Sequence, residues 1–546
     1  MTAPPPVLSS PPRWPRRVGF ALLAAIAVLL GIRFGAVAQD DAFISFRYAD
    51  NLLRGLGFVY NPGEAVEGYS NLLWTLLVAA AMACGADPVM ATVVMGLSSL
   101  VAGVFLTGAL TSAGRRRWIS SPLWLALLPP ALLALDATVA LEAVEGLETV
   151  FYMALVTAAT WLSLEERWVS AVDGWGGHRG SAVLFGVATL TRPEAPYLFA
   201  LVQGGLLIDA ALRGELRRRW RPSVGAGAVV AVWVVALTAW RLWVYGDPLP
   251  NTFYAKTGGL AIGRGLAYLG AHIATHPLLW LLLVLRPLLG RPSRRTLPLA
   301  ALVLGVLAYI LAVGGDFKPT GRFILPILPA MAALGAESAA LLALGERRLQ
   351  RPVPLGLLLL LSPYLLAKRA VGVRVRVWLI GLGLLLLLSP YLVVLQQADR
   401  WGAERHANLE ARRTVGRFLS ENLPPDTVLA IHSAGVIPYY ARLTTIDMWG
   451  LTNRTIARAP ALRFGEGLAG HEKSDPAYVF SLEPDLYLPE DRVFTLQPWN
   501  LEELPREAGF PADFTERYKA VSVPVDGRWL NMWVKRGFLK QVAGRP

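Results

Sequence analysis

The sequence predicts a polytopic α-helical membrane protein with a soluble α/β domain at its C-terminal end. Hydrophobic residues make up 54% of the 546 residues, and charged residues only 17%. Apolar runs long enough to cross a bilayer recur as far as residue 395. From residue 400 the composition changes to that of a soluble protein. We therefore assign residues 1–399 to a membrane core and residues 400–546 to a separate domain.

Taken in order, the apolar windows predict about eleven membrane spans. The first window follows Arg13, Arg16 and Arg17, and no small-residue cleavage site comes after it, so it is interpreted as an uncleaved anchor. The predicted spans are 18–38, 88–110, 118–135, 147–164, 180–190, 194–212, 223–244, 266–286, 297–314, 323–344 and 377–395.

Two further apolar stretches, 71–84 and 353–367, are short for a span. Basic residues favour the cytoplasmic side, and the four early basic runs all fall there only if 71–84 does not cross. We therefore expect a juxtamembrane helix at 71–84, inside a first extracytoplasmic loop of residues 39–87. The second stretch contains GLLLLLSPYL, which occurs at 356–365 and again at 383–392. We expect this stretch not to cross, which gives eleven spans and an extracytoplasmic C-terminal domain. The alternative is that both copies cross, which places that domain in the cytoplasm.

The C-terminal domain is expected to combine strands and helices. The strand-like segment VLAIH at 428–432 is followed by a helix start and then by a second strand-like segment. A domain of this length is large enough to fold around a core of its own.

The composition also excludes several partners and cofactors. The net charge of +13 comes from short basic runs between apolar stretches, which orient membrane helices and do not indicate a nucleic-acid partner. The single cysteine, Cys84, rules out an intrachain disulfide, and the histidines are interpreted as scattered, so no metal site is expected. No G-x-G-x-x-G fingerprint of a nucleotide-binding domain precedes a helix, so a lipid-borne donor is favoured over a nucleotide sugar.

The first loop opens with the acidic pair Asp40 and Asp41, followed by Arg47, Glu64 and Glu67. Adjacent carboxylates repel, so one of them can have a raised pKa that suits a general base, or the two can share a divalent cation. A solvated acid pair is the simpler interpretation, and turn chemistry accounts for the two glutamates. The position of Asp40 and Asp41 directly after the first span favours a functional role for this pair.

Three more segments with unusual polar residues fall on the same predicted side of the membrane: TLTRPEAPY at 189–197, YGDPLPNTFYAKTGG at 245–259 and GGDFKPTGRF at 314–323. Arginine and lysine are the side chains that hold phosphates. A mutual pair of Arg192 with Glu194 is an alternative for the first segment, and snorkelling at the interface is an alternative for each cation singly.

Together these residues resemble the GT-C superfamily of polyprenyl-phosphate-dependent glycosyltransferases. Within it, the sequence is similar to the mycobacterial terminal β-(1→2)-arabinofuranosyltransferase family. The resemblance rests on DDAFISFRYADNL and the rest of the first loop, on TRPE, GDPLPNTFYAK and GGDFKPTGRF, and on IDMWGLTN and GHEKSDP in the C-terminal domain.

The resemblance implies a GT-C core in the cell membrane, a polyprenyl-phosphate sugar donor with arabinofuranose as the best guess, and a glycan or glycolipid acceptor of the cell envelope. Asp40 or Asp41 would be the catalytic carboxylate, with no cofactor expected. Candidate contacts to the donor phosphate and substrate are Arg47, Glu67, Arg192, Glu194, Asn251, Tyr254, Lys256, Asp316, Lys318 and Arg322. Weaker candidates for acceptor binding, each with a structural role as the alternative, are Asp447, Trp449 and His471.

Two other functions stay open at this point. One is a GT-C enzyme for a different sugar, such as mannose. The other is a transporter or flippase of a lipid-linked saccharide, for which we would expect broken helices with charges near the bilayer midplane and repeated halves.

Overall fold

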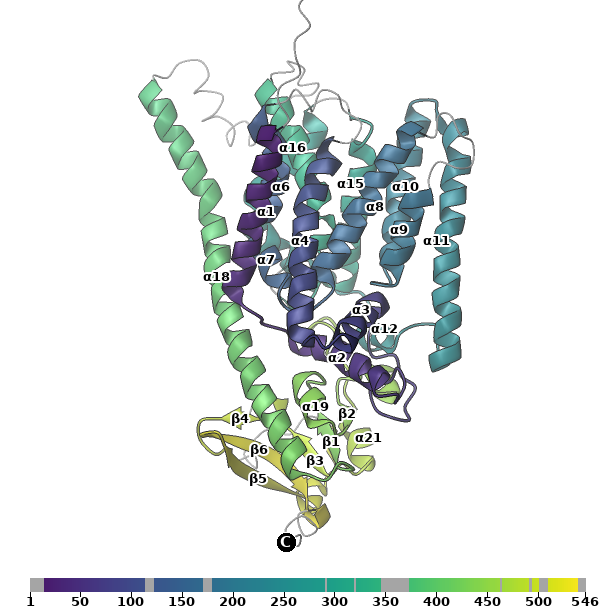
Figure 1. Ribbon diagram of the computed structural model, residues 1–546, viewed down its shortest axis with the longest axis vertical. Helices are drawn as coiled ribbons and strands as arrows, with labels where there is room; N and C mark the ends of the chain where they lie inside the picture. Colours follow the sequence, from purple (N-terminus) through teal and green to yellow (C-terminus); the bar gives the residue numbers. More distant parts are fainter. Residues whose placement is uncertain are drawn as a thin grey trace, which may run out of the picture.

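The computed structural model describes residues 14–112, 122–169, 179–289, 292–318, 321–344, 373–461, 464–490, 493–499 and 509–538. A helical bundle and a smaller α/β domain lie end to end, and the long helix α18 (Val373–Asn422) runs along both (Figure 1). Among the described residues, six helices are long and apolar enough to cross a membrane, and one bent pair could add a seventh. The chain is therefore a multi-pass membrane protein, as predicted, and the count of about eleven spans stays a prediction.

The helices of the bundle follow the predicted apolar windows to within five residues, except that the helix predicted at 223–244 begins seven residues earlier. They are α1 (Trp14–Phe34), α4 (Pro88–Ser112), α6 (Leu123–Ala134), α8 (Thr149–Val169), α9 (Arg179–Thr189), α10 (Ala195–Leu212), α11 (Leu216–Tyr245), α15 (Thr296–Val313) and α16 (Leu328–Leu344). Their facing side chains, such as Leu100, Val150 and Leu302, form one large apolar core. With 12 and 11 residues, α6 and α9 are short for a full span.

The span predicted at 266–286 is not one continuous helix. Helices α13 (Ile262–Thr275) and α14 (Pro277–Leu285) meet at an angle of 101°. Pro277 has no backbone N–H to donate, and its ring disfavours the α conformation at His276, where φ is −129° and ψ is 47°. The two helices together are still apolar enough for one broken span. The break itself was not predicted, because average hydropathy over a window does not register a single proline.

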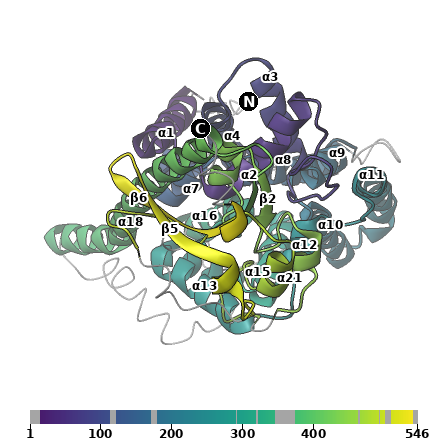
Figure 2. The same cartoon turned by 90° about the horizontal axis from the view of Figure 1, so that it is seen from below.

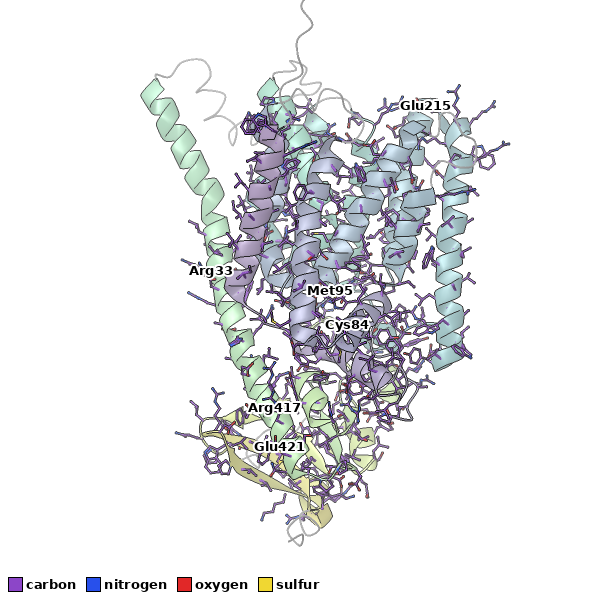
Figure 3. All side chains as sticks on the ribbon, viewed as in Figure 1. Arg33, Cys84, Met95, Glu215, Arg417 and Glu421 are labelled. Carbon is purple, nitrogen blue, oxygen red and sulfur yellow. The ribbon has the colours of Figure 1, made fainter. Side chains whose placement is uncertain are left out.

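The first loop folds into two helices, α2 (Asp40–Leu53) and α3 (Leu72–Ala83), which confirms a short helix at 71–84. Together with α12 (Asn251–Lys256), they lie between the bundle and the C-terminal domain (Figure 1). Figure 3 places Cys84 at this end of the bundle and Glu215 at the opposite end, so the first loop and the basic run 213–221 lie at opposite ends. The apolar stretch 353–367 lies outside the described residues.

The C-terminal domain is built on a mixed six-stranded sheet, as the α/β prediction requires. Strand β1 pairs in parallel with β2 and β3, while β6 pairs in antiparallel fashion with β3, β4 and β5. The strands are β1 (Val428–Ile431), β2 (Thr444–Asp447), β3 (Leu486–Leu488), β4 (Phe494–Thr495), β5 (Tyr518–Val525) and β6 (Arg528–Lys535), and the helices are α19 (Val436–Ala441), α20 (Arg454–Ala457), α21 (Pro476–Ser481) and α22 (Phe514–Arg517). Figure 2, seen from below, shows the sheet stacked over the end of the bundle.

The predicted boundary at residue 400 falls inside α18, which continues as one helix from Val373 to Asn422. Near its end, Val415 and Leu419 are fully buried and pack against the sheet in the same core as Leu429. The composition changes at residue 400 because the helix leaves the bundle there, but the backbone does not break. The domain is therefore connected to the bundle by one continuous helix.

Gly96 of α4 is a packing constraint on this architecture, because an added Cβ would lie 1.9 Å from the carbonyl oxygen of Ala143. Gly96→Ala should lower the midpoint of thermal unfolding in detergent, since overpacking costs about 1–3 kcal/mol. Gly227→Ala in α11 is the matched control, because no atom lies within 4 Å of its added Cβ. Equal midpoints for the two variants would contradict the packing of α4 against residue 143.

Candidate active site between the bundle and the C-terminal domain

Asp40 and Asp41 form the first turn of α2, at the junction of the bundle and the C-terminal domain. The helix dipole stabilises carboxylates at this position. The backbone N–H of Gln39 donates to the carbonyl of Glu145 at 2.9 Å, which fixes the point where α2 begins. Consecutive helix residues point about 100° apart, so the two aspartates face different surroundings.

Asp40 is held by groups of the C-terminal half of the chain. Its carboxylate accepts from the guanidinium of Arg412 at 2.8 Å and from the backbone N–H groups of Gly435 and Val436 at 2.9 Å each. Burial raises the pKa of Asp40 above its usual value, and the charge of Arg412 offsets this only in part. Both carboxylate oxygens are therefore committed to protein donors.

Asp41 has no hydrogen-bond or ion-pair partner within the described part of the chain, and it lines two cavities. Burial acts to raise the pKa of Asp41, but the positive charges of Lys256 and Arg322 nearby hold it below its usual value. The expected raised pKa therefore belongs to Asp40, whereas the carboxylate that is open to a ligand is Asp41.

The larger cavity has a volume of about 300 Å³ and lies between α2, α18 and the C-terminal domain. Its wall includes four aromatic or imidazole rings that follow one another: Phe317, His471, Trp449 and His432, with ring centroids 5.1, 4.3 and 5.5 Å apart in that order. The basic side chains on its wall are paired, Arg412 with Asp40 and Glu490, and Arg405 with Glu145. The cavity is thus aromatic, and its cations are compensated.

The smaller cavity, of about 50 Å³, also borders Asp41 and is lined mainly by polar groups, including Asn71, Glu148, Lys256 and Arg322. Among the described residues no carboxylate pairs with Lys256. The contacts of Arg322 to Glu148 and Asp316 are long, at 3.4 and 3.6 Å, and its buried Nε–H has no acceptor in the part of the chain that the structure describes. This cavity therefore offers two cations with unused donor capacity beside Asp41.

Three buried glutamates near the site were not predicted: Glu142, Glu145 and Glu148, which are at most 2% exposed. Glu145 pairs with Lys318 at 2.6 Å and contacts Arg405, and Glu148 pairs with Arg192 at 3.0 Å. A usable signal was present, because three acids at a spacing of three residues interrupt an otherwise apolar sequence next to predicted spans.

Two of the candidate phosphate contacts are satisfied by these acids. Lys318 is fully buried between Glu142 and Glu145, at 3.4 and 2.6 Å. Arg192 pairs with Glu194 at 2.6 Å, which was the alternative considered for that motif, as well as with Glu148. Their charges are neutralised inside the protein, so these residues support the site and do not face it openly.

Four other candidates hold the first loop and the 245–259 segment in place. Arg47 donates to the carbonyls of Tyr60 and Leu443 at 2.8 and 2.7 Å. Glu67 forms a bidentate pair with Arg241, and burial raises the pKa of Glu67 to about 7. The remaining two are Asn251, whose amide donates to the carbonyls of Gly450 and Leu451, and Tyr254, which donates to Asp247. These contacts keep the four side chains away from Asp41. The prediction placed them at the site because the sequence shows on which side of the membrane a residue lies but not which partner it binds.

Of the three acceptor candidates, one has a structural role and two line the larger cavity. Asp447 is fully buried and accepts from the backbone N–H groups of Trp449 and Thr452, and burial raises the pKa of Asp447 to about 6. It shapes the loop that carries Trp449. Trp449 and His471 both line the larger cavity with Asp41.

The histidines are less scattered than the sequence analysis supposed, since His272 and His276 are four residues apart in and directly after α13. Their rings stack with centroids 4.1 Å apart, and His276 bonds to Asp136 at 2.9 Å beside the helix break. Within the described residues, no three His, Cys, Asp or Glu side chains are grouped so that they could hold a metal ion. The Asp40 oxygens are also committed, which does not favour a cation shared with Asp41.

Comparison with known families and proteins gives matches to the C-terminal domain and to half of the chain. A family described as "Domain of unknown function (DUF8728)" matches residues 400–533. The terminal β-(1→2)-arabinofuranosyltransferase of Mycobacterium tuberculosis is 28% identical over 278 residues, which is 49% of this chain and 43% of the relative. The match thus covers less than half of that relative's length.

Solved structures match over most of the chain. ArnT from Cupriavidus metallidurans, bound to undecaprenyl phosphate, superposes with a TM-score of 0.55 at 13% identity, over 96% of this chain and 99% of that one. The oligosaccharyltransferase AglB from Archaeoglobus fulgidus, in complex with an inhibitory peptide and a dolichol-phosphate, has a TM-score of 0.54 at 11% identity, over 80% of this chain and 65% of that one. Both structures have the GT-C fold that the sequence predicted. This chain therefore has the GT-C fold.

Proposed function

We propose that the protein is a glycosyltransferase that moves a sugar from a polyprenyl-phosphate donor to a glycan or glycolipid acceptor. The observation that carries the proposal is the Asp41 carboxylate, which has no protein partner among the described residues. It lies between a small polar cavity that contains Lys256 and Arg322 and a larger aromatic one. A sugar transfer needs such a carboxylate beside a site for a phosphate leaving group and a site for a hydroxyl-bearing acceptor.

The smaller cavity is the proposed seat of the donor phosphate. Lys256 and the Nε–H of Arg322 can donate to phosphate oxygens and stabilise the charge of the departing polyprenyl phosphate. The undecaprenyl phosphate bound to ArnT and the dolichol-phosphate bound to AglB support a lipid-phosphate ligand for this fold. No cofactor is required by this scheme.

In the transfer, the acceptor hydroxyl attacks the anomeric carbon, the bond from that carbon to the phosphate oxygen breaks, and Asp41 takes the hydroxyl proton. A retaining reaction would use the same carboxylate as a nucleophile or as the counter-ion of the sugar cation. A carboxylate with a lowered pKa is a weak base, but a phosphate bound to Lys256 and Arg322 would neutralise the charges that lower it. Donor binding would thus make Asp41 more basic.

The larger cavity is the proposed acceptor site. Sugar rings bind aromatic faces well, and Trp449 and His471 lie on its wall next to Asp41. Its compensated cations suit a neutral glycan better than an acidic one. The relative from Mycobacterium tuberculosis makes arabinofuranose the first candidate for the transferred sugar, and another GT-C sugar such as mannose is the alternative.

We further propose that the active site and the C-terminal domain are on the extracytoplasmic side of the cell membrane. The basic run 213–221 lies at the end of the bundle opposite to the first loop (Figure 3). Short loops rich in lysine and arginine stay in the cytoplasm, so the opposite end faces outwards.

One observation favours the transporter alternative. The break of 101° between α13 and α14 is the kind of interrupted helix that transporters use, and the polar pair of His276 and Asp136 lies beside it. This site is separate from the two cavities that Asp41 lines.

Asp41→Asn should lower the rate of sugar transfer by about 10²–10⁴-fold, the usual range for loss of a general base. The assay measures transfer from a synthetic polyprenyl-phosphate arabinofuranose, and in parallel the mannose donor, to an oligosaccharide. The matched control is Asp50→Asn, because Asp50 is on the same helix but pairs with the exposed Arg54. Full activity of Asp41→Asn would refute the catalytic role; lipid translocation in vesicles without transfer would establish the transporter.

The pH dependence should differ between the free enzyme and its complex with the donor. Because nearby positive charges lower the pKa of Asp41, the acid limb of kcat/KM for the donor should lie below the usual range of an aspartate. Because the bound phosphate offsets Lys256 and Arg322, the pKa of Asp41 rises in the complex, and the acid limb of kcat should lie at higher pH. Rates measured from acid to neutral pH test this, and coincident acid limbs would contradict it.

A further inference from the structure

The C-terminal domain, which matches a family of unknown function, touches the first loop directly at Asp40. The three donors to this carboxylate come from two elements: Arg412 from α18, and the N–H groups of Gly435 and Val436 from the start of α19. A Cβ at Gly435 would lie 1.9 Å from the backbone oxygen of Asp40, so the two backbones are in contact and only glycine fits.

The contact continues into the domain through Arg412. While one nitrogen of its guanidinium binds Asp40, the other donates to Glu490 at 2.7 Å. Glu490 in turn accepts from the backbone N–H and the hydroxyl of Ser433, at 3.1 and 2.5 Å. Arg412 thus bridges two carboxylates, one at the start of α2 and one in the segment after β3.

This bridge bears on Asp41 because the two aspartates are consecutive in one helix. The rotation of α2 that seats Asp40 also decides where Asp41 points, and a shift of one position would turn it by about 100°. No side chain caps the start of α2, since Gln39 makes no capping hydrogen bond there. The orientation of Asp41 therefore depends on how Asp40 is held.

We infer that the C-terminal domain is a positioning part of the active site, in which Arg412, supported by Glu490, holds Asp40 and thereby aims Asp41 between the two cavities. The inference rests on the proposed function. Arg412 and Glu490 are positioning residues, because they act on the reacting groups through Asp40. This gives the domain a role that a passive cap would not have.

The test compares Arg412→Gln with Arg412→Lys and with Arg417→Gln. Arg417 lies on the same helix near its end (Figure 3), and its side chain is exposed against the ring of Tyr440. Arg412→Gln should lower kcat by about 10–100-fold, the order of loss expected for a small misplacement of a catalytic group. The KM for the donor and the binding of sugar-free decaprenyl phosphate should change less than about threefold, since the phosphate site is elsewhere.

Arg412→Lys keeps the charge and should recover part of the lost kcat, whereas Arg417→Gln should match the wild type. Glu490→Gln combined with Arg412→Gln should cost little more than Arg412→Gln alone, because the two residues act as a unit. Unchanged kcat in Arg412→Gln would overturn the inference. Loss of kcat together with an equal loss of decaprenyl phosphate binding would overturn it as well, because that pattern indicates a general structural role.

Hydrogen exchange of α2 provides a readout that does not depend on activity. Backbone amides of residues 40–53 should exchange faster in Arg412→Gln than in Arg417→Gln, because the start of the helix is released. Equal exchange in the two variants would contradict the inference even if kcat fell. Absence of transfer by the wild-type protein would instead contradict the proposed function, and faster exchange would then show that Arg412 still holds α2.

Discussion

The site depends on the pairing of buried charges by Glu142, Glu145 and Glu148. Ionised groups next to a bilayer are costly unless they are paired or used. These three acids take up the charges of Lys318, Arg405 and Arg192, which come from different parts of the chain. The same segment receives the backbone N–H of Gln39, so the start of α2 is tied to it. Charge pairing thus fixes the bundle end on which the two cavities are built.

The cations that these acids do not fully neutralise decide where a ligand anion can bind. Lys256 has no acid partner among the described residues, and Arg322 is held only by long contacts with one buried N–H unused. Both face the smaller cavity beside Asp41. The adjacent aspartates accordingly divide the work: Asp40 is bound by Arg412 and two backbone groups, whereas Asp41 stays open to both cavities.

The sequence predicted the helical membrane bundle, the α/β domain and the short helix at 71–84, because hydropathy and loop charge are local signals. The acid pair after a span was a local signal that made the first loop a candidate site. It could not separate Asp40 from Asp41, since their roles depend on Arg412 and Gly435, which are hundreds of residues away. For the same reason Arg47 and Glu67 were expected at the site, although Leu443 and Arg241 satisfy them elsewhere. The break at His276 was not predicted, because one proline hardly changes an averaged hydropathy.

The central claim is that Asp41 works beside a phosphate held by Lys256 and Arg322. The most direct measurement is an electron cryo-microscopy structure of the full chain with a bound polyprenyl phosphate. The phosphate should lie in the smaller cavity, within hydrogen-bond distance of both cations and next to the Asp41 carboxylate. A phosphate seated elsewhere, for example beside His272 and His276 at the helix break, would contradict it.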